Sequence, residues 1–87
     1  MTDIVNMQLS DTAAMMGSED YKERFKAEYY QLKIRYHKLH KMVVQYEAGT
    51  LSFTPSCPID LLKRQKAAMG QYLYALEVRA EIEGIKL

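Results

Sequence analysis

The segment Phe25–Lys41, FKAEYYQLKIRYHKLHK, decides the fold, because its apolar residues recur every three or four positions. The repeat runs on past this segment and comprises Phe25, Tyr29, Leu32, Tyr36, Leu39, Val43 and Tyr46. Alternating steps of four and three form a heptad seam with a period of 3.5 residues. The pattern predicts a long helix that packs one face along a second helix.

Helix start and stop signals place this helix at residues 18–48. Ser18 is a favourable N-cap, the acidic residues that follow it suit a first helical turn, and Gly49 suits the position after the last turn. A loop over 49–58 ends in Pro58, a residue favoured at helix starts, and Gly84 ends a second helix over 58–83. Its predicted seam is Leu62, Gln65, Met69, Tyr72, Leu76, Arg79 and Glu83.

The predicted fold is therefore all-α, a long antiparallel helical hairpin over 18–87 preceded by an N-terminal arm or short helix over 1–17. Each long helix also carries a second apolar stripe. The stripe on the first helix comprises Ala27, Tyr30, Ile34, His37, Lys41 and Val44, and the one on the second comprises Ala75, Val78, Ile82 and Ile85. A hairpin buries one stripe per helix, so we expect the hairpins to pack into a homo-oligomeric helical bundle.

Composition restricts the class of protein. The chain has 87 residues and one cysteine, which fits a single small domain without an internal disulfide and a reducing compartment. A formal net charge of +1 disfavours a general nucleic-acid-binding protein. Neither a signal peptide nor a membrane-spanning stretch is visible. We expect a cytoplasmic protein with no membrane association.

The residues offer no catalytic constellation. Cys57 has no evident base beside it, and the chain lacks a phosphate-binding glycine motif. His37 and His40 share a helix face, but no third metal ligand follows at helical spacing. We therefore predict a protein that is not an enzyme and has neither a metal nor a cofactor.

Aromatic and basic residues gather on the first helix. Residues 21–41 hold seven Lys or Arg residues against two Glu residues, a local balance of +5. Rings can stack on bases while cations neutralise phosphates, so the segment suits a small anionic nucleotide ligand. The predicted ligand-binding residues are Lys26, Tyr30, Lys33, Arg35, His37 and Lys41. The other interpretation is that Tyr30 and His37 pack in an oligomer interface and the lysines are merely solvated.

The second helix carries a pattern that resembles a known family. Leu61, Leu62, Gln65, Ala68, Met69, Tyr72, Leu76 and Arg79 follow a leucine- and lysine-rich first helix that ends near a glycine. Over residues 21–84 this resembles a widespread group of small phage and prophage proteins related to a crAss-like phage product. The resemblance implies a phage-encoded protein in the cytoplasm of an infected or lysogenic bacterium, and it assigns no activity to particular residues.

Small helical phage proteins of similar build include sponges that sequester cyclic nucleotide signals of bacterial immunity. By this looser analogy, the leading hypothesis is a non-enzymatic anti-defence protein that binds and sequesters such a signal. The alternative is a protein-interaction module that inhibits a host defence or regulatory protein. Nucleic-acid binding by the basic helix is a third hypothesis, which the near-zero net charge disfavours.

Overall fold

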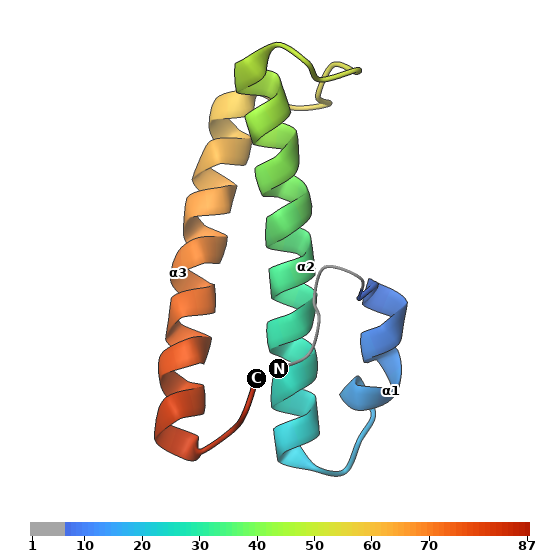
Figure 1. Ribbon diagram of the computed structural model, residues 1–87, viewed down its shortest axis with the longest axis vertical. Helices are drawn as coiled ribbons and strands as arrows, with labels where there is room; N and C mark the ends of the chain where they lie inside the picture. Colours follow the sequence, from blue (N-terminus) through green and yellow to red (C-terminus); the bar gives the residue numbers. More distant parts are fainter. Residues whose placement is uncertain (1–6) are drawn as a thin grey trace.

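The computed structural model describes residues 7–87, and all regular structure in this part of the chain is helical. A short 3₁₀ helix η1 (Leu9–Thr12) leads into α1 (Ala13–Met16), followed by α2 (Tyr21–Ala48) and α3 (Ile59–Glu83). Figure 1 shows α3 packed along one side of α2, with α1 beside the first half of α2 on another side. The first six residues of the expected N-terminal arm lie outside the described residues.

The ends of the long helices have local causes. Asp20, not Ser18 as predicted, caps α2, because its side chain accepts a hydrogen bond from the Lys22 backbone N–H at 2.9 Å, and the helix therefore begins at Tyr21. Gly49 ends α2 at φ 75° and Gly84 ends α3 at φ 70°, a left-handed conformation that glycine adopts at low cost. At α3 the structure makes Pro58 the N-cap, so that the helix itself begins at Ile59.

The core lies between α2 and α3. Its buried members are Phe25, Tyr29, Tyr30, Leu73, Leu76, Ala80 and Ile85. Ile85 belongs to the tail after Gly84, which turns back from the end of α3 toward α2 (Figure 1). The tail therefore covers the end of the core that the two helices alone would leave open.

The predicted seam of α3 was right at Leu62, Met69 and Leu76 and wrong at its other members, Gln65, Tyr72, Arg79 and Glu83, which are exposed. Leu76 is 1% exposed, but Tyr72 and Arg79 lie on the surface, and the helix buries Leu73 and Ala80 instead. This arrangement buries two apolar side chains and leaves a guanidinium in water, which avoids a large desolvation cost.

The displaced seam residues form a polar edge between the two helices. Tyr21 donates a hydrogen bond to Glu83 at 2.9 Å and accepts one from Arg79 at 2.8 Å. The Arg79 guanidinium also lies 4.9 Å from the centroid of the Phe25 ring. Farther along this edge, Tyr72 donates a hydrogen bond to Glu28.

The N-terminal segment covers half of the second stripe of α2. Ala27 and Ile34 are buried at 0% and 5% exposure, and η1 and α1 pack against this helix. Thr12 anchors the segment, because its buried hydroxyl donates to the Leu9 carbonyl at 2.7 Å and accepts from the Gln31 amide at 3.0 Å. This half of the stripe is therefore not left for a second copy, contrary to the sequence-based expectation.

Among residues 7–87, none of the helices is both long enough and apolar enough to cross a membrane.

Candidate functional site

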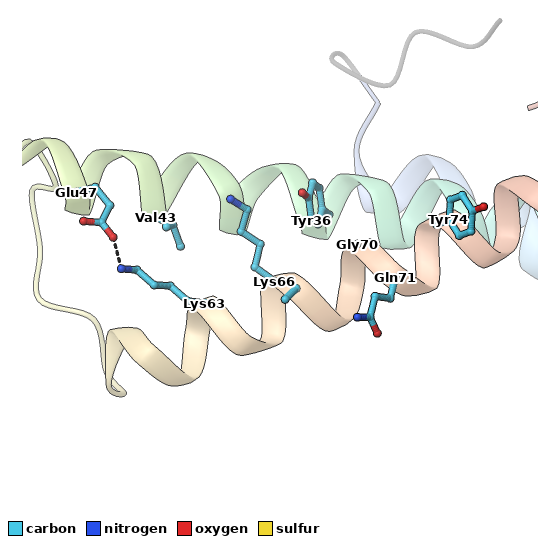
Figure 2. Close-up of a pocket in the computed structure, with 9 residues that line it drawn as sticks. Tyr36, Val43, Glu47, Lys63, Lys66, Gly70, Gln71 and Tyr74 are labelled. Carbon is cyan, nitrogen blue, oxygen red and sulfur yellow. Dashed lines mark ion pairs between the residues drawn. The ribbon is translucent and has the colours of Figure 1, made fainter.

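A groove of about 740 Å³ runs along the edge of the helix pair opposite the polar edge. Its lining residues are Tyr36, Val43 and Glu47 of α2 and Lys63, Lys66, Ala67, Gly70, Gln71 and Tyr74 of α3. Figure 2 shows Val43, Glu47, Lys63 and Lys66 between the two helices and Gln71 pointing away from α2. The volume lies within the range that small-molecule sites usually have.

Helical spacing puts the α3 residues on one face. Lys63, Lys66, Gly70 and Tyr74 are separated by steps of three and four, so their positions line one side of the helix. Gly70 lies against Tyr36, and a Cβ at this glycine would make an ordinary contact of 3.7 Å with Cε2 of the tyrosine. The groove therefore has a small residue at the point where the tyrosine ring crosses it.

Aromatic rings lie at several points of this edge. Tyr36 is half-buried, and its ring is nearly parallel to that of His40, with an interplanar angle of 8° and centroids 6.2 Å apart. Tyr74 is 70% exposed. Both tyrosines are accessible to a planar group, and base–aromatic stacking stabilises a complex by about 1–3 kcal/mol per base.

Two ammonium groups enter the groove from α3. Lys63 forms an ion pair with Glu47, and hydrogen bonding to this carboxylate is the main cause of the raised pKa of the lysine. Lys66 extends from α3 toward α2 in Figure 2. Within residues 7–87, no carboxylate forms an ion pair with Lys66, so its ammonium is available to an anionic ligand.

Beyond the groove, the same edge continues to the buried Tyr29. Its hydroxyl donates a hydrogen bond to Glu77 at 3.1 Å. Burial, reinforced by the negative charge of Glu77 and this hydrogen bond, raises the pKa of Tyr29 to about 12. The tyrosine is therefore neutral throughout the physiological range, and the carboxylate is held against the core.

The residues predicted from the sequence to bind a ligand are spread around α2. Lys26 and Tyr30 line a hollow of about 470 Å³ beside the N-terminal segment and the tail, but Tyr30 is only 3% exposed. The Lys26 ammonium nitrogen lies 3.8 Å from a carboxylate oxygen of Glu23 and forms an ion pair with it. The Lys33 ammonium lies 5.9 Å from the centroid of the Tyr29 ring.

The other three predicted residues, Arg35, His37 and Lys41, are exposed on α2. At 3.6 residues per turn, Arg35 and His37 are about 160° apart around the helix. They therefore point to different sides, and one small ligand on one protomer cannot contact both. The structure thus brings Lys26 and Tyr30 together but does not gather the six residues into one site.

The groove residues of α3 were missed because only the two apolar stripes of this helix were followed in the sequence. A signal was present, since two lysines, a glycine and a tyrosine recur at helical spacing beside that seam. Among the described residues, no group of three or more His, Cys, Asp or Glu side chains is placed to hold a metal ion.

A model of the Sequestin family matches residues 19–82, which is well over half of the chain. The chain belongs to the Sequestin family. The match includes all of α2 and nearly all of α3, and hence every residue that lines the groove. Neither a search of curated proteins nor a search of solved structures gave a match.

Proposed function

We propose that this member of the Sequestin family is a phage-encoded, non-enzymatic anti-defence protein that binds and sequesters a cyclic nucleotide immune signal. The family name itself points to sequestration of a partner molecule. The observation that carries the ligand class is the groove, which combines accessible tyrosines with two ammonium groups. The protein would act in the cytoplasm of the bacterial host, as a homo-oligomer.

In this proposal the aromatic and polar residues of the groove have chemical roles. Tyr36 and Tyr74 stack on the bases, and Lys66 neutralises a phosphate. Lys63 is held near the phosphates by Glu47 and exchanges this carboxylate for the ligand. The Gln71 amide, on the rim, can donate to and accept from a base edge. Binding by these groups needs no bond to be broken.

The six residues predicted from the sequence define a competing site. Lys33 fits both proposals, since helical spacing places it three positions before Tyr36 and on the groove side of α2. Tyr30 disfavours the competing site, because a base cannot stack on a ring that is 3% exposed.

Equilibrium dialysis against a panel of cyclic di- and trinucleotides and cyclic ADP-ribose isomers tests the function. We expect one or more of these to be retained and then recovered intact when the protein is denatured by heat. Recovery of a linear or hydrolysed product would show an enzyme, and no retention at all would contradict a nucleotide sponge.

Charge reversal tests the site. We expect Lys66→Glu to weaken binding about ten- to a hundredfold, because it replaces a charge-assisted hydrogen bond with repulsion. Lys38→Glu, on the exposed surface of α2, is the matched control and should bind normally. A loss of binding in Lys41→Glu, with normal binding in Lys66→Glu, would favour the competing site on α2. Circular dichroism checks that each variant remains helical.

The alternative function, inhibition of a host defence or regulatory protein, is favoured by the apolar surface around the loop between the long helices. Val44 is 50% exposed there and Phe53 is 58% exposed. This function predicts a stable complex with one host protein and no retained nucleotide. A pull-down from host lysate with wild-type protein and with Phe53→Ser distinguishes it, since only the wild type should capture the partner.

A further inference from the structure

The surface of α3 that faces away from α2 carries a regular apolar stripe. Leu61, Ala68, Ala75 and Ile82 recur every seven residues, and Val78 lies beside them. We name these five residues the outer stripe. Its large members are exposed, with Leu61 at 48%, Val78 at 39% and Ile82 at 79%. A heptad repeat on an exposed helix face is typical of a surface that packs against another helix.

The charges of α3 are divided between its two halves. Lys63, Lys66, Glu77, Arg79 and Glu83 point to the groove or bond to α2, which leaves Arg64 in the first half of α3 and Glu81 in the second as the opposite charges for a partner. A second α3 placed antiparallel would bring Arg64 of one protomer near Glu81 of its partner, and a parallel one would set like charges together. This self-complementarity favours a second copy of the chain over an unrelated partner.

The sizes of the stripe residues fit the same arrangement. The alanines Ala68 and Ala75 lie near the middle of α3, with Leu61 near one end and Ile82 near the other. Antiparallel packing brings the leucine of one protomer close to the isoleucine of its partner and lets the helices approach closely at the alanines. We infer that the protein dimerises through the outer stripe, with the two α3 helices antiparallel.

Dimerisation would extend the groove, an inference that rests on the proposed function. Ala67, Gln71 and Tyr74 line the groove from α3 and border the outer stripe at helical spacing. Gln71 points away from α2 in Figure 2, toward the side that the stripe occupies. A partner helix there would form a further wall beside the α3 rim and shield a bound nucleotide from water.

Cys57 provides a direct test, because it is the single cysteine and lies two residues before α3. A spin label on this thiol reports the distance between protomers by double electron–electron resonance. At 1.5 Å per residue, the antiparallel dimer places the two labels about 40–45 Å apart, and a parallel one places them within about 20 Å. A short distance, or no dipolar signal at high protein concentration, would overturn the inference.

Charge exchange provides an independent test of the same interface. Arg64→Glu and Glu81→Lys should each raise the dimer dissociation constant about tenfold, and the double variant should restore it, because the two positions lie in opposite halves of α3. Lys38→Glu is the control and should leave dimerisation unchanged. Light scattering after size exclusion measures each variant, and failure of the double variant to recover would contradict antiparallel pairing.

These measurements use the protein without nucleotide, whereas dialysis tests nucleotide binding. Nucleotide retention by a protein that does not dimerise would overturn the interface and leave nucleotide sequestration standing. Dimerisation of a protein that retains no nucleotide would support the interface and contradict nucleotide sequestration.

Discussion

Tyr29 joins the core to the groove side of the molecule, since its ring is buried and its hydroxyl donates to Glu77 at 3.1 Å. We expect Tyr29→Phe to lower the free energy of unfolding by about 1 kcal/mol at pH 8, the usual contribution of one such hydrogen bond. Chemical denaturation measures this loss. Tyr74→Phe, at a ring that is 70% exposed, is the control and should have no effect.

The same tyrosine gives the protein a dependence on alkaline pH. Its pKa is raised from 10.0 to about 12 in the folded protein, so the unfolded chain loses the proton first as pH rises. The stability advantage of the wild type over Tyr29→Phe is therefore complete below pH 10 and declines between pH 10 and about 12. Denaturation at pH 8 through 11 tests this, and an advantage that grows with pH would contradict it.

At the scale of elements, the glycines of α3 have opposite effects. Gly70 is inside the helix, and a Cβ there would make an ordinary contact of 3.7 Å with Tyr36, so Gly70→Ala should stabilise the protein by about 0.5–1 kcal/mol. Gly84 has φ 70°, so Gly84→Ala should destabilise it by about 1 kcal/mol. Thermal unfolding compares the two variants, and a shift of the same sign in both would contradict this account.

The N-terminal segment is held on α2 largely through Thr12. Thr12→Val removes the acceptor of the Gln31 amide and the donor to the Leu9 carbonyl, and it should cost about 1–3 kcal/mol. Thr54→Val, at an exposed loop position, is the matched control. In Thr12→Val, the backbone amides of η1 and α1 should exchange hydrogen faster than they do in Thr54→Val. Equal exchange in both variants would show that apolar packing alone holds the segment.

The parts of these elements that depend on local signals could be predicted from the sequence, and the parts that depend on long-range packing could not. Glycines act locally, so the long helices and their C-terminal ends follow from the sequence, whereas the N-cap of α2 is Asp20 and not the predicted Ser18. Most of the seam of α2 follows as well, because its apolar residues recur at regular steps of four and three, but its last predicted member, Tyr46, is 43% exposed. The shift to Leu73 in α3 and the burial of Tyr30 depend on contacts with segments distant in sequence, which periodicity does not contain.

The same reason limited prediction of the site. Aromatic and basic residues on α2 indicated an anionic ligand, but the groove is made jointly by α2 and α3. The side of α3 that faces Tyr36 depends on how this helix is rotated about its own axis. The predicted seam was partly wrong, so the sequence did not determine this rotation. Lys63 and Lys66 therefore became candidates only when the structure placed them beside Tyr36.

At the scale of the whole molecule, the two edges of the helix pair differ in how many polar and aromatic side chains are free to bind a ligand. Tyrosine, arginine and glutamate side chains occupy one edge by bonding to one another, as in the contacts of Tyr21 with Arg79 and Glu83. The other edge holds the groove, where Lys66 and Tyr74 remain open to a ligand. Together with the exposed stripe on α3, this asymmetry gives a binding edge and a separate surface for assembly.

Native mass spectrometry of the purified protein, alone and with a panel of cyclic di- and trinucleotides and cyclic ADP-ribose isomers, tests the central claim most directly. We predict an oligomer that gains the mass of unmodified nucleotide in a fixed ratio to its subunits, and a Lys66→Glu variant that assembles equally but needs about ten to a hundred times more nucleotide to gain the same mass. An oligomer that gains no nucleotide mass from any member of the panel would contradict sequestration of a cyclic nucleotide.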